Sequence, residues 1–237
     1  MASINNDARP VPKTRTSCLL PAPILHLSNC VVRPYHPSDG PALAKVADDP
    51  EIARYMRNTF PSPYTLKDAE NWIAIATTPT DDRLGIELPP FLNFAILACP
   101  EPGVGTGSES GREVADDGVD EQNYSDFVFA GGIGLRTMDD VESRTMELGY
   151  WLGRGFRRRG IASEAVRSFS RWAFEAIPQL LRIETRVFGP NEASVRLLSR
   201  CGYVFEGSRR HAVCKRGVVM DMLMHGLLRE ECLAINR

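Results

Sequence analysis

A chain of 237 residues, of which 43% are hydrophobic and 24% charged, is long enough to bury one substantial core. Its net charge of −2 argues against a protein that binds nucleic acids or membrane surfaces, because binding to these anionic partners requires an extended basic face. The six cysteines have no CxxC spacing, and there is no apolar run of 18 residues or signal-like segment. We therefore expect a cytoplasmic protein without a metal site or a disulfide framework.

The N-terminal part predicts a short strand followed by helices. Residues 1–22 mix prolines with basic side chains and predict a disordered tail, with a transit peptide as the alternative. Residues 24–33 predict a first strand, which Pro34 ends. Helices are expected over residues 40–47, again from Pro50, and from a Thr65 cap onward, where apolar side chains recur every three or four positions.

Two apolar strands are predicted next, over residues 91–98 and 127–135. The segment 99–126 between them holds eight acidic residues against one arginine and has few apolar side chains. Such a segment cannot bury enough surface to order itself, so we expect a mobile, glycine-rich loop insertion and not a second domain. The prediction is a single domain over residues 23–230, followed by a C-terminal tail over 231–237.

The most informative stretch is MELGYWLGRGFRRRGIASEA, which starts at Met146. It predicts a strand over residues 146–152, a turn with three consecutive arginines, and a helix that opens at Ile161 after Gly160. The first turn of a helix has free N–H groups and a favourable dipole for negative charge. This stretch therefore predicts an anion site, but it lacks both the Walker pattern and the dinucleotide fingerprint.

The C-terminal part predicts a strand over residues 181–188, a helix that begins near Asn191 and ends before Gly202, and two last strands. The first of these strands starts at Tyr203 and the second covers residues 218–228. The order of elements predicts the α/β class, a mixed sheet with helices on its faces.

Three separated blocks resemble the RimJ/RimL-like branch of the GNAT superfamily of N-acetyltransferases. The sequence Arg157-x-x-Gly160-x-Ala162 matches the Q/R-x-x-G-x-G/A loop with which these enzymes hold the pyrophosphate of acetyl-CoA. VVRPYHPSD, DDPEIARYM and YTLKDAENWI resemble the opening of the branch, and NEASVRLLSRCGYVFEG resembles the segment after its fifth strand. The resemblance covers residues 24–228.

The resemblance implies a mostly antiparallel central sheet that is splayed between its fourth and fifth strands, with helices on both faces. It also implies acetyl-CoA as the cofactor and no metal. Pantetheine would pair with backbone groups in the splay, and the pyrophosphate would lie on the loop and the helix start. The cofactor-binding residues that it implies are Trp151, Leu152, Arg157, Arg158, Arg159, Gly160, Ile161, Ala162, Ser163, Asn191 and Ser194.

The resemblance further implies direct transfer of acetyl to an amine in a ternary complex, without a cysteine intermediate. The backbone N–H at Tyr150 would polarise the thioester carbonyl. Glu147 is the candidate base for the attacking amine, with a strand-edge salt bridge as the alternative. Asp221 and Glu87 are secondary candidates for the base.

The candidate proton donor for the leaving thiolate is not the usual tyrosine. Many GNAT enzymes place a tyrosine seven positions beyond the asparagine that corresponds to Asn191, but this chain has Leu198 there. Ser194 matches the serine proposed for this role in RimL-like enzymes. The alternative is that Ser194 only bonds back to the start of its helix.

The acceptor is expected to be a primary amine, either a protein N-terminus or a small amine, with no nucleic-acid or membrane partner. Four basic residues in the last hairpin would favour an acidic or phosphorylated acceptor over a polyamine: Arg209, Arg210, Lys215 and Arg216. A non-catalytic acyl-CoA-binding module of the same fold is the alternative function. Both a monomer and a homodimer fit the sequence.

Overall fold

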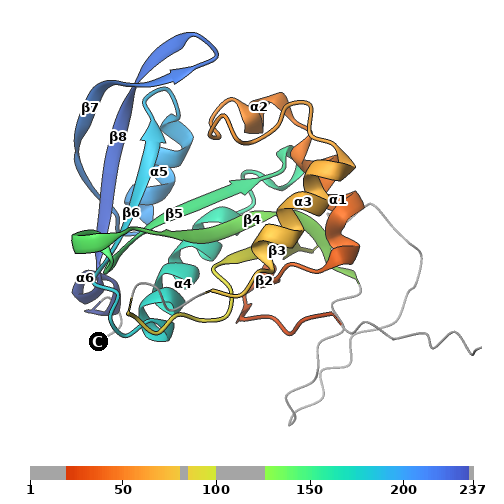
Figure 1. Cartoon of the computed structure of the whole chain (residues 1–237), viewed down its shortest axis with the longest axis horizontal. Coiled ribbons are helices and arrows are strands. Elements are labelled where there is room, and N and C mark those ends of the chain that lie inside the picture. Colours follow the sequence, from red (N-terminus) through yellow and green to blue (C-terminus); the bar gives the residue numbers. More distant parts are fainter. Residues whose placement is uncertain (1–19, 81–84, 100–125, 235–237) are drawn as a thin grey trace, which may run out of the picture.

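The computed structural model describes residues 20–80, 85–99 and 126–234. Eight strands form one sheet in the order β1-β2-β3-β4-β5-β6-β8-β7 (Figure 1). All neighbouring strands are antiparallel except β5 and β6, which are parallel. The strands are β1 (Leu25–His26), β2 (Cys30–Pro34), β3 (Asn93–Ala98), β4 (Val128–Thr137), β5 (Thr145–Leu152), β6 (Arg182–Phe188), β7 (Val204–Lys215) and β8 (Val218–Leu228).

Helices cover both faces of this sheet, as the sequence predicts. They are α1 (Gly40–Ala47), α2 (Pro50–Ala53), α3 (Leu66–Ala76), α4 (Ile161–Ala176), α5 (Glu192–Arg200) and α6 (Arg229–Ala234). Alternation along β3 separates two cores, since Phe94 and Ile96 pack with α4 while Ala95 and Leu97 pack with α1 and α3. The predicted α/β fold with a mostly antiparallel sheet is confirmed.

Both ends of the domain differ in detail from the predicted elements. The strand predicted over residues 24–33 is split into β1 and β2 by a tight turn, in which Leu27 N–H donates to Cys30 O at 2.9 Å. Glu164 of α4 holds this turn through the backbone N–H and the hydroxyl of Ser28. Residues 231–234, predicted as tail, belong to α6. Most of segments 1–22 and 99–126 lies outside the described residues.

The sheet opens between β5 and β6, which diverge in Figure 1. The two strands pair only at Thr145–Arg182, Met146–Ile183 and Glu147–Glu184. From Leu148 onward, β5 pairs with β4 on one side and, among the described residues, with no strand on the other. This opening is the splay that the resemblance implies between the fourth and fifth strands, which are β5 and β6 here because the predicted first strand is split in two.

Candidate functional site

Two residues of β5 direct their backbone groups into the opening. Gly153 N–H donates to Ala130 O at 2.9 Å, and the register between β4 and β5 is regular. Since hydrogen bonds alternate along an antiparallel pair, Trp151 bonds toward β4 while Tyr150 and Leu152 face the gap. The backbone groups of Tyr150 and Leu152 are therefore the ones available to a ligand in the opening, whereas those of Trp151 face β4, and the pantetheine contacts stay a prediction.

The N-terminus of α4 lies beyond the end of β5 and has no side-chain cap. Its N-cap residue, Gly160, has a left-handed backbone with φ of 79°, which glycine adopts without strain. In the described part of the chain, the backbone N–H groups of Ile161, Ala162 and Ser163 have no hydrogen-bond partner. A Cβ built on Gly160 would meet no atom within 4 Å, so the space beside this glycine is open. Free donors and open space fit a diphosphate.

The three consecutive arginines of this loop have different surroundings. Arg157 donates from Nε to Leu152 O at 3.3 Å and lies 3.6 Å from the Asp49 carboxylate. Arg159 donates to Cys99 O at 2.8 Å, while its buried Nη1 has no partner. Arg158 is exposed, and its guanidinium makes no hydrogen bond or ion pair with a described residue. Arg157 and Arg159 therefore brace the loop, and Arg158 is the arginine with all its donors available.

A pair of hydroxyl groups spans the opening. Tyr150 Oη lies 2.6 Å from Ser194 Oγ on α5, and burial raises the pKa of Tyr150. Asn191 caps α5, because its Oδ1 accepts from Ser194 N–H at 3.2 Å. Leu198, at the position where related enzymes have a tyrosine, is fully buried in the core. The sequence singled out Tyr150 and Ser194 separately, but not their contact.

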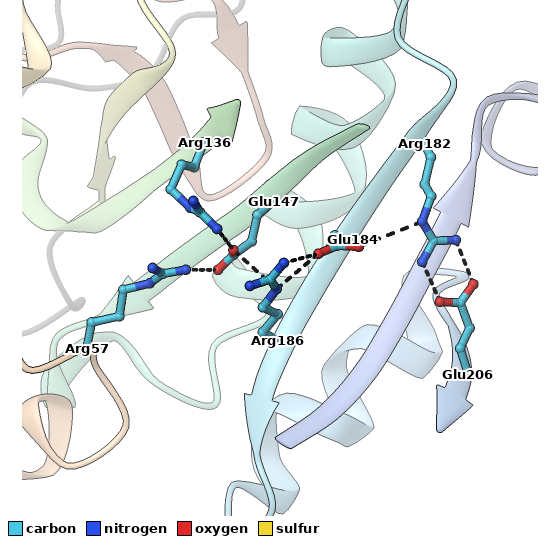
Figure 2. A network of polar contacts seen from close by, with 7 residues as sticks. All are labelled: Arg57, Arg136, Glu147, Arg182, Glu184, Arg186 and Glu206. Atoms are coloured by element: carbon cyan, nitrogen blue, oxygen red, sulfur yellow. Dashed lines mark hydrogen bonds and ion pairs between the residues drawn. The ribbon is translucent and has the colours of Figure 1, made fainter. Parts of the chain in front are cut away.

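Glu147 lies at the point where β5 and β6 begin to diverge, in a cluster of charges (Figure 2). Its two oxygens accept hydrogen bonds from Arg57 and Arg136, and Arg186 lies 3.5 Å away. Arg186 also donates to Glu184 at 3.0 Å. Arg136 stands directly opposite Glu147 on β4, and Arg186 comes from β6, so three elements and a loop supply this cluster.

These contacts decide the charge state of Glu147. Burial raises its pKa, but hydrogen bonds from Arg136 and Arg57 outweigh burial, and the pKa is lowered overall. The salt-bridge alternative is thus present in the structure, and the general base at Glu147 stays a prediction. Of the secondary candidates, Asp221 accepts hydrogen bonds from His211 N–H and Ser208 within its own hairpin, and Glu87 is exposed.

A hollow of 280 Å³ lies beside this cluster. Arg57, Glu147 and Arg186 form its polar wall, and Phe188 and Met222 are among its apolar lining residues. Of the four hairpin cations named from the sequence, only Lys215 lines it, and Lys215 donates to Met56 O and Arg57 O. Arg210 instead lines a separate concavity with His211 and Asp221.

In residues 20–80, 85–99 and 126–234, His, Cys, Asp and Glu side chains form no group of three or more that could hold a metal ion. None of the helices in that part of the chain has the length and apolar character needed to cross a bilayer.

Comparison with known proteins gives a match to the acetyltransferase (GNAT) domain family over residues 29–204. Over 121 residues the chain is 31% identical to YdaF of Bacillus subtilis (strain 168), provisionally named as a ribosomal N-acetyltransferase. This alignment covers 51% of the chain and 65% of YdaF, which is less than two thirds of that relative.

Two solved structures share the fold. The ribosomal-protein-alanine acetyltransferase of Vibrio fischeri superposes with a TM-score of 0.61 at 16% identity, covering 87% of this chain and 97% of that one. The self-immunity acetyltransferase MccE, solved with acetyl-CoA and AMP, superposes with a TM-score of 0.60 at 16% identity, covering 85% and 93%. At these identities, the likeness shows the fold alone.

Proposed function

The chain belongs to the GNAT acetyltransferase family, and from this we propose that it transfers an acetyl group from acetyl-CoA to a primary amine. The observation that carries the proposal is the uncapped N-terminus of α4 beside the opening between β5 and β6. Related proteins are named for acetylating ribosomal proteins, so we take a protein N-terminal amine as the first acceptor to test. We place this activity in the cytoplasm.

Acetyl-CoA supplies an activated acetyl group as a thioester. The backbone of Tyr150 and Leu152 would bind its pantetheine amides as an added strand. The N–H groups from Arg158 to Ser163 would hold the diphosphate, with Arg158 adding charge-assisted contacts. Asn191, at the start of α5, would also contact the cofactor, because the N–H groups of its side-chain amide are not used by the cap.

Two groups of β5 and α5 would act on the reacting atoms. The Tyr150 N–H faces the gap and would polarise the thioester carbonyl as the amine attacks. The Tyr150–Ser194 hydroxyl pair would hydrogen-bond the leaving thiolate. A tyrosine with a raised pKa is a weaker acid than a thiol, whose pKa is about 8.5. The pair would therefore stabilise the thiolate without giving up its proton completely, and solvent would complete the protonation.

The attacking amine must be neutral, and the arginines around Glu147 help to meet this condition. Nearby positive charge disfavours an ammonium ion and lowers the pKa of an amine. Glu147, with its own lowered pKa, would be a weak base, and it would act chiefly by holding Arg57 and Arg136 in place. We keep it as a residue needed for turnover.

A non-catalytic acyl-CoA-binding module is the second candidate, because Leu198 replaces the usual tyrosine. Calorimetry with acetyl-CoA tests the cofactor site, and an acceptor screen with detection of released thiol tests transfer. Binding together with thiol release on a peptide N-terminus supports the enzyme. Binding without release on any peptide, lysine or small amine supports the module, and absence of binding refutes both.

A further inference from the structure

The charge cluster beside the hollow has a second consequence, which concerns the acceptor. We infer that Arg57, Arg136 and Arg186 form a binding site for an anionic group, a carboxylate or a phosphate, that the acceptor carries away from its reacting amine. This inference rests on the proposed function for the amine, but the anion site can be measured without any turnover.

The cluster carries more positive than negative charge. Three guanidinium groups surround two carboxylates, Glu147 and Glu184. A neighbouring arginine, Arg182, forms an ion pair with Glu206, so these two residues together do not change the excess of positive charge (Figure 2). Lys215 lines the same hollow, and its ammonium, which donates to Met56 O and Arg57 O, adds a further positive charge.

Two of the three arginines are the accessible part of the cluster, and the third, Arg186, is 25% exposed. The Glu147 and Glu184 side chains are 11% and 10% exposed, whereas those of Arg57 and Arg136 are 55% and 49% exposed. The carboxylates therefore lie beneath the arginines, and a ligand would meet guanidinium groups first. Such a surface attracts anions and repels polyamines.

Arg57 and Arg136 also have unused donors. Among the described residues, each makes its hydrogen bonds through one terminal nitrogen, Nη2, to Glu147. An arginine has five N–H donors in a planar fork that matches a carboxylate or phosphate in a bidentate manner. Arg57 is held for this purpose, because Lys215 binds the carbonyl oxygens of Met56 and Arg57 and fixes the loop.

A contribution to the stability of the fold does not account well for the position of Arg57 in this cluster. Its side chain is more than half exposed, and surface ion pairs contribute little to folding because water screens them. Glu147 would still have Arg136 and Arg186 as partners without it. Arg57, the third arginine of the cluster, would therefore contribute more to binding of an anion than to stability of the fold.

The position of the cluster determines how far the anionic group of the acceptor would lie from its reacting amine. Glu147 precedes Tyr150 by three residues, which along a strand corresponds to about 10 Å. An extended peptide whose amine lies near Tyr150 would place the side chain of its second or third residue near the arginines. The preferred acceptor is therefore a peptide N-terminus with an acidic or phosphorylated residue at one of these positions.

The test is a binding measurement with CoA bound and no acetyl group present. Four peptides, Ser-Gly-Xaa-Gly-Gly-Tyr, differ only at Xaa, which is Glu, phosphoserine, Gln or Lys. By calorimetry we expect the Glu and phosphoserine peptides to bind about tenfold tighter than the Gln peptide, because charge-assisted hydrogen bonds are lost with Gln. The Lys peptide should bind weakest, and the comparison of Glu with phosphoserine separates the two anions.

Arg57→Gln should reduce the preference for Glu over Gln to less than about threefold while leaving CoA affinity unchanged. Arg54→Gln is the matched control, since it removes the same charge from an exposed position three residues away that does not line the hollow. Equal affinities for the four peptides, no binding of any of them, or a preference that persists in Arg57→Gln would overturn the inference. If these peptides show the preference but release no thiol from acetyl-CoA in a separate transfer assay, the proposed function is refuted and the anion site stands.

Discussion

At the scale of single residues, the part of the chain that the structure describes contains two tyrosine–serine hydroxyl pairs with different surroundings. Tyr150 meets Ser194 at 2.6 Å across the opening in the sheet, whereas Tyr203 meets Ser170 at 2.8 Å inside the core. Only the first pair borders the site where the thioester would lie. The second pair has the same chemistry and offers an internal control.

We expect Tyr150→Phe and Ser194→Ala each to lower kcat about ten- to hundredfold, because each removes a hydrogen bond to a developing thiolate. The KM for acetyl-CoA should change little, since the backbone contacts remain. The double variant should be no more than a few-fold slower than either single variant, because the two groups act as a unit. Steady-state kinetics with a thiol-release assay provides the measurement.

Tyr203→Phe should lower the free energy of unfolding by about 1 kcal/mol and leave kcat unchanged, as a buried hydrogen bond remote from the thiolate is lost. If Tyr203→Phe and Tyr150→Phe reduced kcat to the same extent, the effect would be one of packing, and the assigned role of Tyr150 would be wrong.

Glu147 makes a residue-scale prediction about pH. Its folded-state pKa is lowered, so the charge network stabilises the fold above the ordinary carboxyl pKa and loses this effect as the pH falls through the folded-state value. Glu147→Gln should lower the free energy of unfolding by about 1–3 kcal/mol at pH 7, because Arg57 and Arg136 lose their carboxylate partner and Arg186 loses one of its two. Chemical denaturation from pH 7 to pH 3 should show this difference shrinking at the acidic end.

The same lowered pKa bears on catalysis. Glu147 is already ionised at neutral pH, so the pH dependence of kcat/KM above pH 6 should reflect the acceptor amine and not this carboxylate. Glu147→Gln should therefore reduce the rate without altering the shape of the profile in that range. Loss of an ascending limb in the variant would restore Glu147 as the titrating base.

At the scale of elements, the start of α4 determines whether the cofactor binds. Ala162→Glu would add a carboxylate to the first helical turn, where it suits the helix dipole but repels a diphosphate. We expect the affinity for acetyl-CoA to fall at least about tenfold while the fold is retained, since charge-assisted contacts to the helix start would be opposed. Calorimetry of CoA binding and thermal melting of the free protein measure the two quantities.

Ala74→Glu on α3 is the matched control, because it makes the same change at an exposed helical position far from α4 in the sequence. It should leave the affinity for acetyl-CoA unchanged. Equal affinity in the Ala162→Glu variant and the wild type would show that the diphosphate lies elsewhere.

At the scale of the whole molecule, the cofactor would add contacts between parts of the chain that few direct hydrogen bonds join, such as those of Tyr150 with Ser194 and of Arg157 with Leu152. It would contact β5, the arginine loop, α4 and α5 together, and these elements border the opening between β5 and β6. A ligand that binds only the folded state stabilises that state by mass action.

Acetyl-CoA at 100 times its Kd should raise the free energy of unfolding by about 2.7 kcal/mol. For a domain of this size, the Tm should rise by roughly 5–10 °C. The Ala162→Glu variant at the same concentration should show a much smaller shift. Differential scanning calorimetry with and without the ligand measures both, and an unchanged wild-type Tm would contradict the proposed site.

Much of the fold could be predicted because its signals are local. The strand over Val218–Leu228 and the helix that opens at Ile161 have the predicted starts, since apolar periodicity and a glycine before the helix lie within a few residues. The split of the first strand was missed, because it depends on Glu164 binding Ser28 from 136 positions away. Periodicity within one segment contains no information about such a contact.

The sequence by itself determined the family, the order of elements and the loop that would hold a diphosphate, because each is written in consecutive residues. Only the tertiary structure decided which of the three loop arginines is free, that Tyr150 faces Ser194 from 44 positions away, and that Arg57 reaches Glu147 from 90 positions away. The physical reason is that charge state and hydrogen bonding depend on neighbours in space, and folding brings these neighbours together from segments whose own patterns only specify a strand, a helix or a loop.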